Sequence, residues 1–177
     1  MSAPEFPLRL AIPVDAVTLA ALSVQVFLDT YATEGVRQDL AIEAFETYSV
    51  AAFAERLAEP GRIFILAEAG SGLLGYAEVL LASLPAPAGG VTGAELVRLY
   101  VQPAAQRHGI GRALLSRMEQ AVAGAGLAAV WLTAWEGNID ARAFYSRLGY
   151  ADVGATTYTF QGNDYPNRVL ARRLAGD

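Results

Sequence analysis

The sequence predicts a single α/β domain in which strands alternate with helices and part of the sheet is parallel. Three observations lead to this fold class. Apolar runs of strand length alternate with segments of helical periodicity. The 177 residues fit one domain, 1–177, and no linker or internal repeat divides them. The 54% content of hydrophobic residues is ample for one core.

The first half of the chain predicts helices between short strands. Its expected elements are a strand at 8–12, a helix at 14–31, a helical stretch within 40–58 and strands at 62–68 and 74–81. Pro13 ends the first strand, Pro60-Gly61 ends the second helical stretch, and Gly70-Ser71-Gly72 is a hairpin turn. Three aromatic side chains of that stretch are expected to face the core: Phe45, Tyr48 and Phe53.

The second half follows a Pro/Gly-rich loop at 83–93. Its expected elements are strands at 95–101 and 128–135, helices at 110–123 and 138–148, and a final pair of strands at 150–160 and 168–174. The strand at 95–101 is apolar at almost every position, which is typical of a strand covered on both faces. The helix at 110–123 carries one apolar stripe: Ile110, Leu114, Met118, Ala121 and Val122.

The composition excludes several chemistries. The chain has no cysteine, which rules out disulfides and a cysteine nucleophile, and no lysine, which rules out a Schiff base. With one histidine, no metal centre is expected. The net charge of −5 argues against nucleic acid as a partner. Without a long apolar run or a secretory signal at the N-terminus, we expect no membrane span and a cytoplasmic location.

The segment 95–112, ELVRLYVQPAAQRHGIGR, contains a motif suited to binding a pyrophosphate. Gly109 and Gly111 remove Cβ atoms where the backbone must turn and approach a ligand. The free N–H groups and the dipole of the following helix favour an anion there. A Walker loop would need Gly-Lys, and a dinucleotide fingerprint would need a third glycine. The remaining alternative is that the glycines merely shape a strand-to-helix turn.

A second motif begins at Asn138 and reads NIDARAFYSRLGY. Together the two motifs resemble those of the GNAT superfamily of N-acyltransferases, in the right order and at the right separation. The resemblance implies the GNAT fold: a mixed, mostly antiparallel sheet with a central parallel pair splayed around the cofactor, flanked by about four helices. Shorter matches resemble the PaiA-type polyamine acetyltransferase branch: Phe27-Leu28-Asp29-Thr30-Tyr31, Gly75-Tyr76, Leu99-Tyr100-Val101, Trp135-Glu136-x-Asn138 and Gly162-Asn163-Asp164.

The resemblance implies an acetyl-CoA-dependent N-acetyltransferase acting on a primary amine. The acceptor would be a polyamine or another small amine, attacking directly in a ternary complex. Two alternatives stay open: an enzyme that acetylates a protein N-terminus or lysine, and an acyl-CoA-binding sensor without catalysis. Family habit and the apolar content also suggest a homodimer.

The same resemblance assigns the cosubstrate contacts. Backbone groups of Leu99, Tyr100 and Val101 would pair with the pantetheine arm and polarise the thioester carbonyl. Asn138 would bond the cosubstrate near its pantetheine, although its position also fits a helix N-cap. The pyrophosphate loop would comprise Gln106, Arg107, His108, Gly109, Ile110, Gly111 and Arg112.

For catalysis, the resemblance points to Tyr145 as the group that donates a hydrogen bond or proton to the departing thiolate. A core aromatic is the alternative for this residue. Glu95 is the candidate base, with Glu78 on the neighbouring strand and water as alternatives; either carboxylate could be a solvated strand-end charge. His108 is expected to pack in the loop or face solvent. Four residues are candidates for binding the amine: Asp29, Tyr31, Glu34 and Glu136. The default interpretation of each is a surface charge.

Overall fold

The computed structural model describes residues 6–70 and 72–174, which form two compact units. The first unit contains the described residues up to Val79 together with Arg98–Met118. The second contains Leu80–Val97 and the described residues from Glu119 onward. Ser71 of the expected hairpin turn, and residues 1–5 of the segment inspected for a secretory signal, lie outside the described residues.

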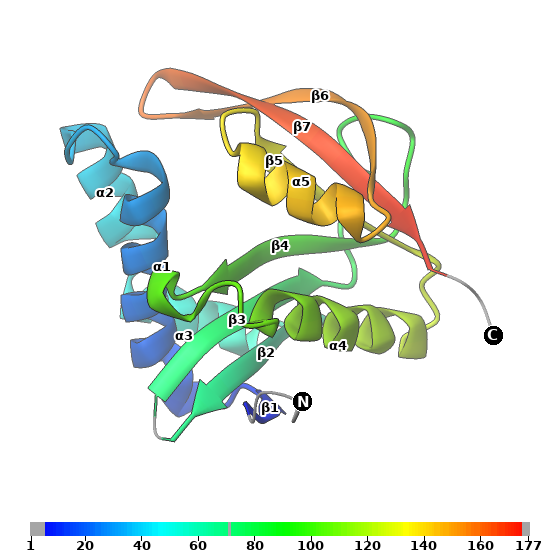
Figure 1. The fold of residues 1–177 in the computed structure, drawn as a ribbon, viewed down its shortest axis with the longest axis horizontal. Helices are drawn as coiled ribbons and strands as arrows, with labels where there is room; N and C mark the ends of the chain where they lie inside the picture. Colours follow the sequence, from blue (N-terminus) through cyan, green and yellow to red (C-terminus); the bar gives the residue numbers. More distant parts are fainter. Residues whose placement is uncertain (1–5, 71, 175–177) are drawn as a thin grey trace. The chain divides into compact units, whose positions relative to one another are not determined.

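Most predicted elements are present within one or two residues of their expected bounds (Figure 1). The elements up to the third strand are β1 Leu8–Leu10, the 3-10 turn η1 Pro13–Asp15, α1 Ala16–Tyr31, α2 Gln38–Thr47, α3 Val50–Ala58, β2 Arg62–Ala69 and β3 Gly72–Leu80. Those that follow are β4 Ala94–Val101, the 3-10 turn η2 Pro103–Ala105, α4 Ile110–Gly124, β5 Ala129–Trp135, α5 Ile139–Arg147, β6 Ala151–Phe160 and β7 Asn163–Arg173.

The strands form a mixed seven-stranded sheet of order β1-β2-β3-β4-β5-β7-β6, and β4 passes from the second unit into the first. Strand β4 pairs in parallel with β5 through Ala94 with Val130 and Glu95 with Trp131. The pairs β1–β2, β5–β7 and β6–β7 are antiparallel. This arrangement confirms the predicted GNAT fold class with its parallel pair.

The single helical stretch expected within 40–58 is wrong, because two helices occupy it. Ser49 separates them: its side chain accepts a hydrogen bond from the Ala52 backbone N–H at 3.1 Å and so caps α3. Tyr48 and Phe53 are buried as predicted, whereas Phe45 is 75% exposed. The prediction for Phe45 failed because α2 turns Leu40 and Ala44 to the core instead.

Strand β7 begins at Asn163, five residues before its predicted start. The error arose because residues 162–164 were interpreted as the turn, whereas Asn163 and Asp164 already pair with Phe160 and Thr159 of β6. The pairing of β5 with β7 ends at Trp135 with Asn167, so residues 163–166 pair only with β6, where Pro166 lies opposite Thr157. A proline is tolerated there because no second neighbouring strand requires its missing N–H.

The core of the first unit lies where α1 packs against α2 and α3. Ser23 of α1 donates to the Leu19 carbonyl at 2.6 Å, and its oxygen lies 2.7 Å from the Tyr76 hydroxyl. Because the single serine proton is used on Leu19, Tyr76 donates this second bond. Residues 13–31 have a mean hydropathy of 1.2, and by length and composition could span a membrane, but these contacts are those of a core helix.

The second unit is built on the β6–β7 hairpin and β5. Figure 1 shows α5 crossing β5 and β7, and an ion pair of 4.0 Å joins Arg142 of α5 to Asp152 of β6. The loop at 83–93 folds back on itself through a 2.8 Å bond from the Ala86 N–H to the Val91 carbonyl. Its apolar residues pack on the sheet in a cluster formed by Ala86, Ala88, Val91, Trp131, Val153, Val169 and Ala171.

Gly75 of β3 allows a close approach of two strands in the first unit. A Cβ atom at this position would lie 2.6 Å from the Tyr100 carbonyl oxygen and 3.1 Å from the Val101 Cα. Because both are backbone atoms, Gly75→Ala should lower the free energy of unfolding by about 1–3 kcal/mol, measured by urea denaturation. Gly72→Ala in the same strand is the control, since its Cβ would make an ordinary 3.7 Å contact with the Ala69 oxygen. Equal stability of the two variants would contradict this prediction.

Candidate active site

The predicted pyrophosphate loop connects β4 to α4 within the first unit. The turn η2 begins at Pro103, and Gln106 donates from Nε2 to the Val101 carbonyl oxygen at 3.2 Å, which fastens the loop to the end of β4. Helix α4 begins at Ile110, which is buried, as are Leu114 and Met118 of the predicted stripe. The loop is therefore held at both ends, by a hydrogen bond at β4 and by apolar packing at α4.

Two loop residues have left-handed backbone conformations. Gly109 has a φ of 85°, which explains the glycine in front of the helix. Arg107 has a φ of 65°, an uncommon conformation for a residue with a Cβ atom. Together they reverse the chain so that the N–H groups of the first turn of α4, which have no partners within the helix, are presented beside the loop. Gln106, Arg107, His108, Gly109 and Arg112 are all exposed.

The single histidine fits its predicted role in the loop. His108 is exposed, and its Nδ1 lies 3.4 Å from the Ala105 carbonyl oxygen. This contact lies within the loop itself. As expected, His108 therefore combines local packing with solvent exposure.

The end of β4 is supported by aromatic residues. The Tyr100 hydroxyl lies 3.0 Å from the Tyr48 hydroxyl, and the Tyr100 ring packs against Tyr76 at 5.7 Å. Burial raises the pKa of Tyr100 well above its ordinary value, so its hydroxyl stays neutral. Tyr100 therefore uses its side chain to anchor the strand whose backbone, at Leu99–Val101, is the predicted pantetheine contact.

Glu78 is buried between two arginines, which corrects its description as a solvated strand-end charge. The side chain is fully buried, and its two oxygens accept hydrogen bonds from Arg62 at 2.6 Å and from Arg98 at 2.7 Å. Burial acts to lower the pKa of Arg98, but Glu78 together with neighbouring tyrosines outweighs burial and holds that pKa well above its ordinary value. Because arginines occupy both oxygens and the side chain is fully buried, Glu78 is poorly placed to contact a substrate.

A third arginine of the first unit lies near this pair. Arg56 of α3 lies 4.3 Å from the centre of the Phe53 ring and donates to the Thr47 carbonyl, and its buried Nη1 has no partner among the described residues. Burial lowers the pKa of Arg56, and the positive charge of Arg98 lowers it further. This arginine group was not predicted; the only signal in the sequence was a lone carboxylate within the apolar stretch of 72–81.

Tyr145 lies in α5 of the second unit, and Asn138 is the residue directly before this helix. The Asn138 side chain accepts from the Ala141 backbone N–H at 3.1 Å, which confirms the N-cap alternative. Tyr145 is 7% exposed and packs edge-on against Phe144 at 5.2 Å and Tyr150 at 5.6 Å. Burial raises the pKa of Tyr145 above its ordinary value, so the phenol keeps its proton at any physiological pH.

Glu95 lies at the start of β4, in the second unit, and is half-buried. Its register partner is Trp131, and paired residues of neighbouring parallel strands direct their side chains to the same face of a sheet. Glu95 therefore shares a face with Trp131. The structure thus places the pyrophosphate loop and Leu99–Val101 in one unit, and Glu95, Asn138 and Tyr145 in the other.

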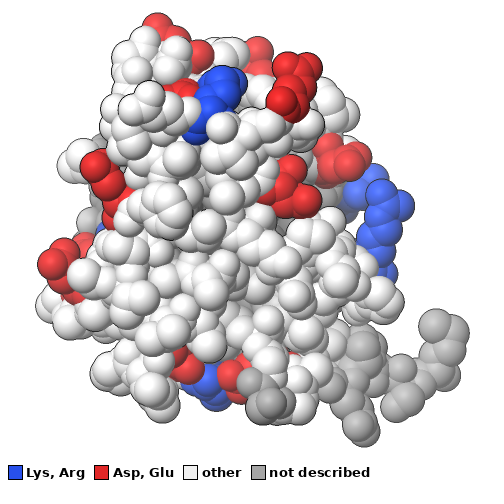
Figure 2. Space-filling view, turned by 90° about the vertical axis from the view of Figure 1, so that its left-hand side faces the viewer, with Lys and Arg blue, Asp and Glu red and all other residues white. Residues whose placement is uncertain are grey.

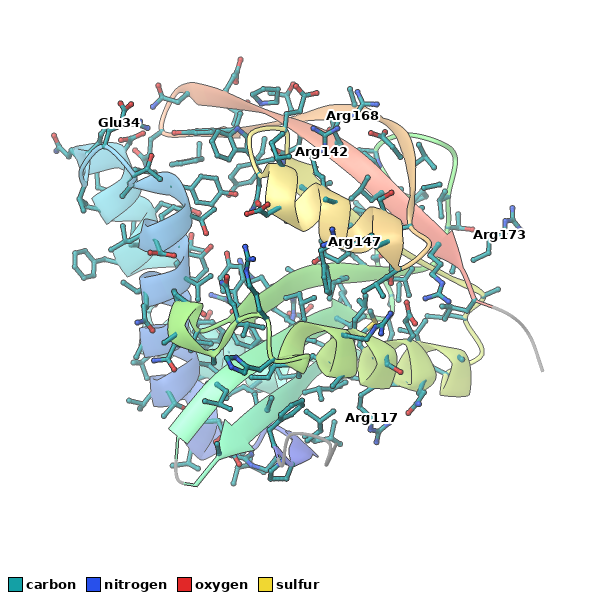
Figure 3. All side chains as sticks on the ribbon, viewed as in Figure 1. Glu34, Arg117, Arg142, Arg147, Arg168 and Arg173 are labelled. Carbon is teal, nitrogen blue, oxygen red and sulfur yellow. The ribbon has the colours of Figure 1, made fainter. Side chains whose placement is uncertain are left out.

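The four candidates for amine binding occupy different environments. Asp29 and Glu34 are exposed, and Figure 3 shows Glu34 beyond the end of α1. Tyr31 is half-buried, with its ring 5.0 Å from that of Phe27. Glu136 lies 3.8 Å from Arg168, so it takes part in a surface ion pair of the second unit. The default interpretation as surface charges therefore fits Asp29, Glu34 and Glu136.

Comparison with known proteins identifies the family. The Acetyltransferase (GNAT) family model matches residues 29–150. An uncharacterized N-acetyltransferase of Mycobacterium tuberculosis is 27% identical over 160 residues, which cover 90% of this chain and 98% of that protein. Another, encoded in the pepI 3' region of Lactobacillus delbrueckii subsp. lactis, is 24% identical over 86% of this chain and 88% of that protein.

Solved structures share the fold at low identity. The PaiA N-acetyltransferase of Thermoplasma acidophilum, in complex with coenzyme A, aligns with a TM-score of 0.74 and 22% identity over 98% of this chain and all of that one. YncA of Salmonella typhimurium, with acetyl-CoA, aligns with a TM-score of 0.69 and 19% identity over 98% and 96% of the two chains. From the fold, the two motifs and the match of the family model to 29–150, we conclude that this chain belongs to the GNAT family of acetyltransferases.

Proposed function

We propose that this protein transfers the acetyl group of acetyl-CoA to a small primary amine, by direct attack in a ternary complex. The observation that carries the proposal is the loop at 106–112. Two left-handed residues there, Arg107 and Gly109, present the first turn of α4 at the end of the strand Ala94–Val101. A helix start of this kind binds phosphate groups through backbone N–H donors, without a lysine.

The residues around the loop fit coenzyme A. The N–H groups of Ile110, Gly111 and Arg112 would hold the pyrophosphate, and the exposed guanidinium groups of Arg107 and Arg112 would add charge-assisted bonds. The backbone of Leu99–Val101 would pair with the pantetheine arm. In the other unit, Asn138 uses its Oδ1 as a helix cap, which leaves its side-chain NH₂ as a donor for the cosubstrate contact that the family resemblance implies.

Tyr145 would stabilise the thiolate that departs when the amine attacks. A buried, neutral phenol is a hydrogen-bond donor, and burial keeps the pKa of Tyr145 raised. A thiol has a pKa of about 8.5 and a phenol about 10, so full proton transfer from tyrosine to thiolate is uphill by about 2 kcal/mol before burial is counted. We therefore favour a hydrogen bond that forms as charge develops on sulfur, with the proton finally supplied from the amine side.

The amine must lose a proton before or during attack. An alkyl ammonium has a pKa of about 10.4, so only about one molecule in a thousand is neutral at pH 7. Glu95 would accept this proton directly or through water, and the pairing of Glu78 with Arg62 and Arg98 makes that carboxylate the weaker candidate. Base catalysis of this kind contributes roughly 10²- to 10⁴-fold, and positioning of amine and thioester contributes more.

The acceptor class is supported by charge and by similarity. The face shown in Figure 2 is mostly uncharged, with carboxylates spread more widely than arginines, in keeping with the net charge of −5. Such a surface favours a cationic acceptor over an anionic one. The fold similarity to the PaiA N-acetyltransferase, together with the short sequence matches to that branch, supports a polyamine as one candidate.

Gly111→Val tests the cosubstrate site. A branched side chain in the first turn of α4 should obstruct the pyrophosphate and weaken acetyl-CoA binding by about tenfold or more, a loss of at least 1.4 kcal/mol. Isothermal titration calorimetry measures this affinity. Gly124→Val is the matched control, because Gly124 ends the same helix and its Cβ would have open space. Unchanged affinity in a folded Gly111→Val protein would contradict the assignment of the loop.

A panel of amines and peptides tests the acceptor. Release of the free thiol of coenzyme A from acetyl-CoA is followed with each acceptor in turn. We expect release with small primary amines, polyamines among them. Release with peptides alone would indicate a protein acetyltransferase, and acetyl-CoA binding without release on any acceptor would indicate a sensor.

A further inference from the structure

One face of the sheet in the second unit differs chemically from the other. Side chains alternate along a strand, and the registers of β5, β6 and β7 identify those that share this face. We name it the Asn167 face. Its central members are Trp131, Thr133 and Trp135 of β5, Asn167, Val169 and Ala171 of β7, and Thr156 of β6.

The two ends of the Asn167 face have different surroundings. At one end, Trp131 lies in the buried apolar cluster under the loop at 83–93. Further along, Thr133 is exposed and Asn167 is half-buried. The Asn167 Oδ1 atom is buried, and no group among the described residues donates a hydrogen bond to it. A buried carbonyl oxygen without a hydrogen-bond donor lowers the free energy of unfolding, so we expect a ligand to donate a hydrogen bond to this atom.

Aromatic rings accompany this acceptor. Asn167 is the register partner of Trp135, whose ring packs so closely on Gly137 that a Cβ there would collide with it. Tyr165, two residues before Asn167 in β7, stacks on Phe160 with ring centres 4.6 Å apart and planes 8° from parallel. Tyr158 and Phe160 lie 5.6 Å apart on the same face of β6. The faces of such rings attract cations and exclude carboxylates.

The arginines nearest Asn167 belong to the opposite face, and Arg173 lies on the Asn167 face only at its far end, opposite Ala129. Arg168 follows Asn167 directly and therefore points the other way, where it binds Asp152 at 2.7 Å. Figure 3 shows Arg168 close to Arg142 of α5, which approaches the same aspartate at 4.0 Å. None of the central members of the Asn167 face carries a positive charge, whereas Glu95 lies beside Trp131 in register. A carboxylate bound here would meet no cation from these residues.

We infer that the Asn167 face binds the acceptor and selects primary amines that lack a carboxylate group. Asn167 Oδ1 accepts a hydrogen bond from an N–H of the acceptor, and the aromatic rings stabilise its positive charge. A carboxylate would have to be desolvated beside these rings without a charged partner, which is costly. Asn167 is thus a specificity-determining residue. This inference rests on the proposed function and adds the substrate class to it.

Matched acceptors that differ by one carboxylate test the inference: cadaverine against lysine, and tyramine against tyrosine. Thiol release from acetyl-CoA gives kcat/KM for each. Tryptophan fluorescence gives binding independently of turnover, because both tryptophans of the chain, Trp131 and Trp135, lie on this face. We expect the amines without a carboxylate to be preferred by about tenfold or more, equivalent to at least 1.4 kcal/mol, and to perturb the fluorescence at lower concentration.

Variants at the acceptor residue complete the test. Asn167→Leu should raise KM for the amines by about tenfold or more and leave the Kd of acetyl-CoA unchanged. Asn167→Asp, which keeps an oxygen in place, should retain a low KM for the amines. Thr157→Val is the control, because Thr157 is exposed on the opposite face of β6.

The outcomes separate this inference from the proposed function. Equal kcat/KM and equal fluorescence response for each pair would overturn the selectivity and leave the acetyltransferase proposal standing. An unchanged KM in folded Asn167→Leu would remove Asn167 from the acceptor site. Selective fluorescence changes without thiol release on any amine would support the binding face and overturn the proposed reaction.

Discussion

Tyr145→Phe is expected to reduce kcat by roughly 10- to 10³-fold, which corresponds to about 1.4–4 kcal/mol of lost transition-state stabilisation. The substitution keeps the ring that packs against Phe144 and Tyr150, and removes only the hydroxyl. Because the proposed hydrogen bond strengthens only as charge develops on sulfur, the Kd of acetyl-CoA and the melting temperature should change little. Steady-state kinetics, calorimetry and thermal unfolding on one preparation measure all three quantities.

Tyr150→Phe supplies the matched control from the same aromatic group. The Tyr150 hydroxyl donates to Glu119 at 2.9 Å, and Glu119 also binds Arg172 at 3.0 Å, so this hydroxyl has a structural partner. Its removal should lower the free energy of unfolding by about 1–3 kcal/mol, because its partner is a charged group, and leave kcat nearly unchanged. Normal turnover in Tyr145→Phe, with an amine that the native enzyme acetylates well, would remove Tyr145 from the mechanism.

The elements that could be predicted from the sequence are those whose signals are local. Apolar periodicity and the glycines of the loop placed α4 correctly, and the match to the second motif placed α5 around Tyr145. The helix break at Ser49 was missed because a serine N-cap is a weak signal inside a longer apolar pattern. The start of β7 was missed because residues 162–164 were interpreted as the turn, and the pairing of Asn163 and Asp164 with β6 is a property of the assembled sheet.

The site was predictable to the extent that it follows sequence motifs. The loop at 106–112 and Tyr145 lie in contiguous segments, so the resemblance to the family's two motifs could propose both of them. The environments of Glu78 and Asn167 depend on strands that are distant in the sequence. A carboxylate beside two arginines, and a carbonyl oxygen without a donor, are recognised only when burial and partners are known.

The second large effect is expected at Glu78. Glu78→Gln keeps the shape of the side chain but removes the charge that two buried guanidinium groups share. Arg62 and Arg98 have side chains only 13% and 16% exposed, and Arg56 adds a third positive charge that interacts with Glu78 and Arg98. Breaking a buried ion pair in this way costs about 3–5 kcal/mol, so chemical denaturation should show a loss of that size.

Glu59→Gln is the control, because it removes the other carboxylate that binds Arg62. Glu59 also binds Arg62, at 2.7 Å, but its side chain is 42% exposed, so its loss should cost about 1 kcal/mol or less. A double variant, Glu78→Gln with Arg98→Met, should regain part of the stability lost in Glu78→Gln, because it removes the cation that Glu78 alone neutralises, whereas Arg62 keeps Glu59. If Glu78→Gln were as stable as Glu59→Gln, the carboxylate would not be the counter-charge that holds β4 against β3, and its role as a base would have to be considered again.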